Sequence, residues 1–201
     1  MMGPLWRGLR ALGLVAGLAL AGCGEPPPSR FTGSDISGSD FGRVLDLADH
    51  NGRKITLDTF KGQVVVLFFG YTHCPDVCPT TLSDMAQAMK LMTPEEAGRI
   101  QVLFVSVDPE RDTPEILKAY VPYFHERFLG LHGSPEEVAA AAKEFRIMYR
   151  KHVEPGASSY LVDHSAGSYV LDGEGRLRLY FPFAHPSQDI AHDLKLLIST
   201  G

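Results

Sequence analysis

The chain has 201 residues, a formal net charge of −5 and 44% hydrophobic residues. That length and apolar content are typical of one globular domain with its own core. A mildly acidic chain has no basic surface stripe to neutralise phosphates, so we expect no nucleic-acid partner.

The first 22 residues differ from the rest. Arg7 and Arg10 precede an apolar run at residues 11–21, and this segment contains no acidic residue. The run is too short to span a bilayer comfortably, so the pattern predicts a signal peptide over residues 1–22. Its removal takes away two arginines, and the net charge falls from −5 to −7.

The stretch Leu20-Ala21-Gly22-Cys23 resembles the bacterial lipobox, in which the cysteine is lipidated and becomes the new N-terminus. Ordinary cleavage, which would leave a free thiol at Cys23, is the alternative. Residues 23–40 are rich in Pro, Ser and Gly, and we expect them to form the lipidated cysteine and a flexible tether. The domain would then occupy residues 41–201, outside the cytoplasm (periplasmic side) and anchored to a membrane.

The first predicted element of the domain is a hairpin. Its first strand includes Val44 to Leu47, its turn lies at Asn51-Gly52, and its short second strand lies near Ile55. The continuous apolar run at residues 64–69 predicts a strand buried on both faces. Residues 80–92 have helical spacing, and the methionines on one side of this helix indicate core packing.

The second half alternates strands and helices. The predicted elements are a buried strand at 102–107, a helix starting at Thr113-Pro114, a helix from Ser134 to about Met148, a loop or hairpin at 149–163, a strand pair at 168–171 and 177–181, and a helix at 188–198. This order predicts an α/β fold with a central mixed sheet flanked by helices.

Cys74 and Cys78 follow the first buried strand, where a thioredoxin-like fold carries its chemistry. Pro79 disfavours helical geometry at Cys78, so we expect the next helix to begin at Pro79. A helix N-terminus favours thiolates, which either bind a soft metal or attack a disulfide. The Cys-x-x-x-Cys spacing alone does not separate these uses.

Of the eight histidines, His164 stands out because it lies on a loop entering a predicted sheet strand and could face the thiols. His73 is its local rival, but it is adjacent to Cys74 in the sequence and its side chain could point elsewhere. Asp163 is a candidate to orient the His164 ring, with a turn-capping role as the alternative.

Three blocks of the sequence resemble the SCO/SenC family and occur in the family's order: Gly70 to Pro79, Ser106 to Pro114 and Val162 to Ser165. The resemblance extends over about residues 36–199. It implies a thioredoxin-like fold and one copper per chain, bound by Cys74, Cys78 and His164. It also implies a role in maturing the dinuclear copper site of cytochrome c oxidase. No ligand role transfers to His73, because that position varies in the family.

The residue chemistry agrees with copper. Two thiolates and one imidazole suit Cu(I) and can also hold Cu(II), whereas a structural zinc site usually has four protein ligands. We therefore expect a copper metallochaperone rather than an enzyme. Expected partners are the copper-bearing oxidase subunit, other extracytoplasmic copper chaperones or thiol reductants, and the membrane through the lipid anchor.

Three other functions stay open. The first is a thiol–disulfide oxidoreductase that keeps the cysteines of the copper-acceptor subunit reduced. The second is a redox or copper sensor. A peroxidase is the weakest, because the cysteine pair has no recognisable peroxide-binding arginine.

Overall fold

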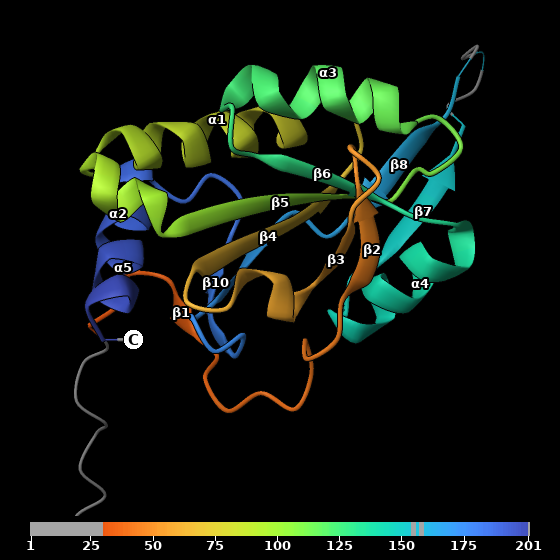
Figure 1. The fold of residues 1–201 in the computed structure, drawn as a ribbon. Helices are drawn as coiled ribbons and strands as arrows, with labels where there is room; N and C mark the ends of the chain where they lie inside the picture. The colour runs from red at the N-terminus through yellow and green to blue at the C-terminus, as the bar shows by residue number, and fades with distance from the viewer. Residues whose placement is uncertain (1–29, 154–155, 157–158, 201) are drawn as a thin grey trace, which may run out of the picture.

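The computed structural model describes residues 30–153, 156 and 159–200 (Figure 1). The predicted signal peptide and Cys23 lie outside the described residues. The strands are β1 (Ser34–Asp35), β2 (Asp46–Asp49), β3 (Lys54–Thr56), β4 (Val64–Gly70), β5 (Ile100–Ser106), β6 (Leu129–His132), β7 (Tyr149–His152), β8 (Leu161–His164), β9 (Ser168–Leu171) and β10 (Leu177–Phe181). The helices are α1 (Val77–Lys90), α2 (Pro94–Gly98), α3 (Pro114–Phe124), α4 (Pro135–Glu144) and α5 (Ser187–Thr200), with a 3-10 turn η1 (Leu57–Phe60).

Eight strands form one mixed sheet in the order β1-β10-β9-β4-β5-β6-β2-β3. β4, β5 and β6 run parallel at its centre, and β9 lies antiparallel to β4. Every residue of β4 and β5 is buried, as expected for apolar strands covered on both faces. The predicted α/β fold with a mixed sheet is therefore confirmed.

Successive residues of β4 point to opposite faces of the sheet and show which helices cover each face. The Phe68 ring lies 6.0 Å from that of Phe104, which in turn lies 5.9 Å from Tyr120 of α3. The Phe69 ring lies 5.7 Å from that of Phe145, just after α4. Accordingly α1 and α3 lie on one side of the sheet and α4 on the other (Figure 1).

The hairpins predicted near residues 44–55 and 168–181 are present, and the segment at 149–163, predicted as a loop or hairpin, contains the antiparallel pair β7 and β8. β2 and β3 pair antiparallel, and β2 joins the sheet beside β6, which is the predicted N-terminal addition. Gly52 in their turn has φ +79°, a conformation that glycine adopts without strain. β9 and β10 likewise pair antiparallel. Helix α4 is shorter than predicted: it ends at Glu144, because Arg146 has φ 54° and breaks the helical run.

The predicted boundary of the domain at residue 41 lies too late in the chain. Ser34 of β1 pairs with Tyr180 at the edge of the sheet. The buried carboxylate of Asp193 accepts hydrogen bonds from the backbone N–H groups of Thr32 (3.0 Å) and Gly33 (2.8 Å). Residues 32–40 thus belong to the folded domain and not to the tether. Among the described residues, no helix has the length and apolar character needed to cross a bilayer.

Candidate metal centre

The two cysteines lie where β4 passes into α1. Helix α1 begins at Val77 rather than at the predicted Pro79, so Cys78 lies in its first turn. Proline is tolerated there because the first-turn N–H groups have no partner within the helix. Cys78 is fully buried, whereas Cys74 on the preceding loop is half-buried. The backbone N–H of Cys78 donates to Cys74 Sγ at 3.4 Å.

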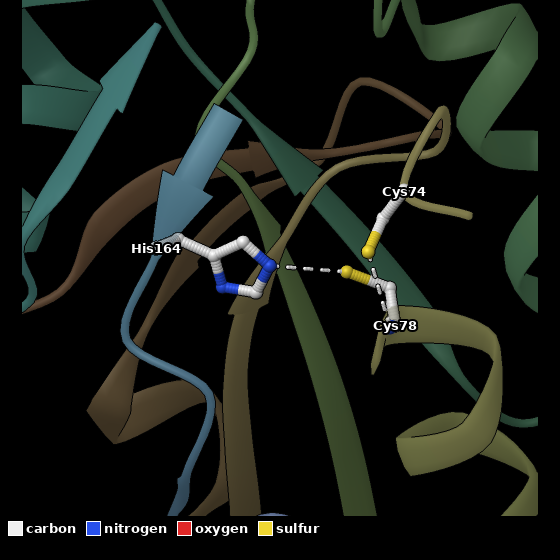
Figure 2. Close-up of side chains that lie close together, drawn as sticks. All are labelled: Cys74, Cys78 and His164. Carbon is white, nitrogen blue, oxygen red and sulfur yellow. Dashed lines mark hydrogen bonds between the residues drawn. The ribbon is translucent and has the colours of Figure 1, made fainter. Parts of the chain in front are cut away.

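His164 is the last residue of β8, and its ring faces the thiols (Figure 2). Its Nε2 lies 3.4 Å from Cys78 Sγ. The other ring nitrogen, Nδ1, lies 3.0 Å from the carbonyl oxygen of Ser165. A carbonyl only accepts hydrogen bonds, so Nδ1 carries the proton and Nε2 presents its lone pair to the thiols.

The imidazole is held between two aromatic rings as well. The rings of Phe68 and Tyr71 meet that of His164 edge to face, at centroid distances of 6.0 and 5.9 Å. Together with the Nδ1 hydrogen bond, these contacts fix the orientation of the ring. The three potential ligand atoms of Cys74, Cys78 and His164 lie within 4.8 Å of one another, and no other such group of His, Cys, Asp and Glu occurs among the described residues.

The two sulfurs differ electrostatically. A hydrogen bond from Cys78 lowers the pKa of Cys74 to about 3, against the opposing effect of burial. Burial raises the pKa of Cys78 above its ordinary value, and the neighbouring Cys74 sulfur raises it further. The two sulfurs are not joined in a disulfide, and the opposite pKa shifts favour a thiolate at Cys74 beside a thiol at Cys78.

The SCO1/SenC family model matches residues 34–199. The chain belongs to the SCO1/SenC family. A cattle protein described as "Protein SCO2 homolog, mitochondrial" is 38% identical over 152 residues, which are 75% of this chain and 57% of that protein.

Solved structures agree with the family. Apo Sco1 from Thermus thermophilus is 43% identical with a TM-score of 0.74, covering 83% of this chain and 96% of that one. Bradyrhizobium japonicum ScoI, solved with copper bound, is 37% identical with a TM-score of 0.71, covering 78% of this chain and 99% of that one. These neighbours confirm the thioredoxin-like fold.

Two residues considered beside the thiols lie elsewhere. The carboxylate of Asp163 does not reach His164: it is exposed, 3.2 Å from His152 Nδ1 and 3.9 Å from Arg150. Neighbours on a strand point to opposite faces, so the residue next to His164 turns away from the site, and the prediction that Asp163 orients the ring is wrong. His73 Nδ1 lies 3.1 Å from Thr72 Oγ1 and is not part of the Cys-Cys-His group.

The sequence reasoning missed the role of Asp112 in this SCO1/SenC site. Its fully buried carboxylate accepts from the Thr72 N–H (3.0 Å), the Thr72 hydroxyl (2.6 Å) and the Ser106 hydroxyl (2.7 Å). It therefore ties the thiol loop to the end of β5. The sign available in the sequence was the family block from Ser106 to Pro114, which contains Asp112.

Proposed function

We propose that this protein binds one copper ion through Cys74, Cys78 and His164 and delivers it for assembly of the dinuclear copper site of cytochrome c oxidase. The observation that carries the proposal is the convergence of two sulfurs and one imidazole nitrogen within 4.8 Å. This soft donor set suits Cu(I) and also accommodates Cu(II). Bradyrhizobium japonicum ScoI, which is 37% identical, was solved with copper bound, and this supports copper as the metal.

Delivery requires that an acceptor can reach the metal. An open groove of about 530 Å³ adjoins His164 and is lined by Met148, Tyr149, Arg150, Asp163, His164 and Ser165. Cys74 is half-buried rather than enclosed. The histidine and the thiols come from separate elements, so an acceptor ligand can replace one donor while the others keep hold of the ion. Stepwise exchange of ligands is the mechanism that we infer.

The test is copper titration of the reduced full-length protein in detergent. We expect one copper per chain, loss of tight binding in Cys74→Ser and Cys78→Ser, and weaker binding in His164→Ala. His125→Ala and His192→Ala are the controls, because neither histidine is in the ligand group. Unchanged affinity in His164→Ala would remove the third ligand from the proposal.

The pKa of Cys74 favours a second function, that of a thiol–disulfide oxidoreductase. A half-buried thiolate next to a buried thiol is the arrangement of an attacking and a resolving cysteine. Attack on an acceptor disulfide would form a mixed disulfide, and Cys78 would release the reduced acceptor as the pair is oxidised. An external thiol reductant would then restore the pair. Reduction of an acceptor disulfide that proceeds equally well in His164→Ala would support this function over delivery.

The proposed setting is the periplasmic face of a membrane. It rests on the signal-peptide pattern of residues 1–22 and on the lipobox ending at Cys23. We propose that a lipidated Cys23 and a short tether hold the domain at the membrane. The proposed partners are the copper-bearing subunit of the oxidase and the extracytoplasmic chaperones or thiol reductants that load or reduce the site.

A further inference from the structure

His164 is carried by a pair of strands, β7 and β8, which we call the histidine hairpin. The two strands pair with each other, with Tyr149 opposite His164. Among the described residues they have no strand pairing with the main sheet that carries the thiol loop. Contacts other than strand pairing therefore help to set the distance between His164 and the cysteines.

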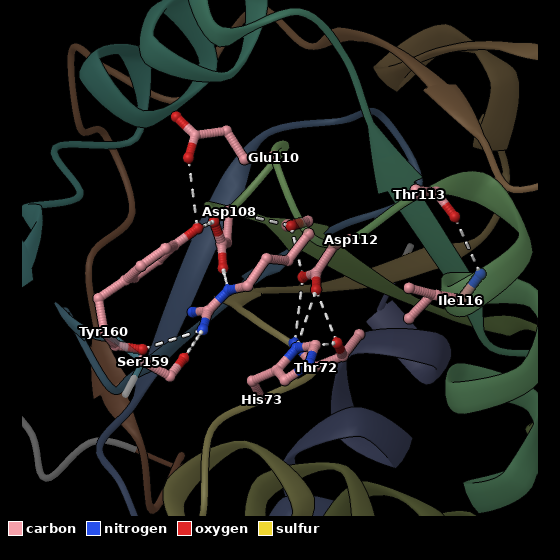
Figure 3. Close-up of polar contacts among 11 residues, drawn as sticks. Thr72, His73, Asp108, Glu110, Asp112, Thr113, Ile116, Ser159 and Tyr160 are labelled. Carbon is pink, nitrogen blue, oxygen red and sulfur yellow. Dashed lines mark hydrogen bonds and ion pairs between the residues drawn. The ribbon is translucent and has the colours of Figure 1, made fainter. Parts of the chain in front are cut away.

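The densest of these contacts joins Tyr160, just before β8, to the loop after β5 (Figure 3). Arg111 donates from Nη1 to the carbonyl oxygen of Tyr160 at 2.9 Å, and its guanidinium lies 3.7 Å from the centre of the Tyr160 ring. Arg111 Nε also donates to Asp108, and the Tyr160 hydroxyl donates to the same carboxylate at 2.7 Å. The three side chains thus form a closed ring of contacts.

The same loop holds the thiol side of the site. Residues 108–112 form one tight turn, in which the N–H of Asp112 donates to the carbonyl of Asp108 at 3.0 Å. Within this turn, Arg111 and Asp108 hold Tyr160, and Asp112 holds Thr72, two residues before Cys74. One short segment therefore contacts both parts of the chain that supply ligands.

The chemistry of the contact depends on arginine. Asp108 is fully buried, and the side chain of Arg111 is 17% exposed. A guanidinium can stack on a ring while its separate N–H groups bond a carboxylate and a carbonyl, whereas a lysine ammonium cannot make this set of contacts. A buried Asp108 without its arginine would be an uncompensated charge.

We propose that Arg111, held by Asp108, is a positioning residue that places the histidine hairpin so that His164 reaches the metal. The inference rests on the proposed copper function and adds a residue that does not touch the ion. Arg111 acts on copper only through His164. Its loss should therefore matter when the histidine is present and be silent when the histidine is absent.

The experiment is a double-mutant cycle with Cu(I) in competition with a chromogenic chelator, using the reduced full-length protein in detergent. We expect Arg111→Met to lower copper affinity on the order of tenfold, the scale on which residues supporting metal ligands act. In the His164→Ala background we expect Arg111→Met to cause no further loss. Equal loss in both backgrounds would show that Arg111 acts on the fold or the thiols and would overturn the proposal.

Arg53→Met is the matched control, because it breaks another ion pair between an arginine and a fully buried aspartate, Asp49, in the turn between β2 and β3. We expect it to leave copper affinity unchanged. If Arg111→Met does not fold, Tyr160→Phe replaces it: this variant keeps the stacked ring, loses the bond to Asp108, and should weaken copper binding in the same His164-dependent way.

A copper-free measurement separates this inference from the proposed function. In apo protein, Arg111→Met should speed amide hydrogen exchange in β8 and leave exchange in β5 unchanged. Unchanged exchange in β8 would overturn the positioning role whatever the copper result. If His164→Ala binds copper like the unmodified protein, the ligand assignment fails instead, and the exchange result still decides whether Arg111 holds the hairpin.

Discussion

Gly70, the last residue of β4, leaves the space that the Cys78 sulfur occupies. A Cβ added there would lie 2.6 Å from Cys78 Sγ and 2.8 Å from Phe104 Cε2. Ordinary contacts between such atoms begin at about 3.5 Å, so Gly70→Ala requires a displacement of about 1 Å. Cys78 and Phe104 are fully buried, and neither can move into solvent. Overpacking of this kind destabilises a protein by about 1–3 kcal/mol.

The same displacement should disturb the metal site, because ligand geometry tolerates shifts of only about 0.5 Å. We expect Gly70→Ala to unfold at lower urea concentration and to bind Cu(I) on the order of tenfold more weakly. Gly98→Ala is the control, since its Cβ would meet nothing closer than Arg127 Nη1 at 3.7 Å. Wild-type copper affinity and stability in Gly70→Ala would refute the argument that this glycine sets the position of Cys78.

Three further predictions concern other parts of the chain. Burial alone would raise the pKa of Asp193, but hydrogen bonds from the N–H groups of Gly33 and Thr32 outweigh burial and lower it. The carboxylate therefore stabilises the fold at pH values above its unfolded pKa of about 3.9, and this stabilisation is lost as the pH falls through the folded pKa. Asp193→Asn should therefore lower stability by about 1–3 kcal/mol at neutral pH and should then lose less stability in acid than the parent protein does. Urea unfolding at several pH values measures both effects, and equal acid sensitivity in variant and parent would contradict this prediction. Tyr120→Phe should raise stability by about 1 kcal/mol, because the hydroxyl is buried without a hydrogen-bond partner in the described structure, and a fall in copper affinity would instead assign the hydroxyl to the site. Cys23→Ser should release the protein from membranes or block its processing. A Ser variant that is still acylated and membrane-bound would contradict the lipobox prediction.

The elements that could be predicted from sequence are those with local signals. The apolar run of β4 and the capping side chain of Ser134 each act within a few residues, and the structure confirms both. The anchoring of β1 was missed because the residue that holds Gly33 is Asp193, 160 positions away. No local pattern reveals such a pair. β6 was missed because its four residues, Leu-Gly-Leu-His, are too few to show a clear strand pattern and include a glycine.

The same distinction applies to the site. Cys74, Cys78 and His164 were identified by residue type and by family resemblance, and the structure brings their ligand atoms together. Asp163 was chosen for its adjacency to His164, which on a strand places it on the opposite face. Asp112 closes the turn at residues 108–112, and its carboxylate also holds the thiol loop. Which partner a buried carboxylate meets depends on tertiary packing.

The arrangement of the three donors makes oxidation and copper binding mutually exclusive. A disulfide between Cys74 and Cys78 would consume both sulfurs and leave the imidazole of His164 alone, which is too few donors for tight copper binding. The ring so closed is short and constrains little of the unfolded chain, so oxidation should change binding far more than stability. His164 takes part in only one of the two chemistries, since thiol–disulfide exchange needs two sulfurs and no distant imidazole. A chain that served only as a reductase would gain nothing from holding that ring between Phe68 and Tyr71 with Nε2 turned to the thiols. The contacts that orient His164 therefore favour copper binding at this site.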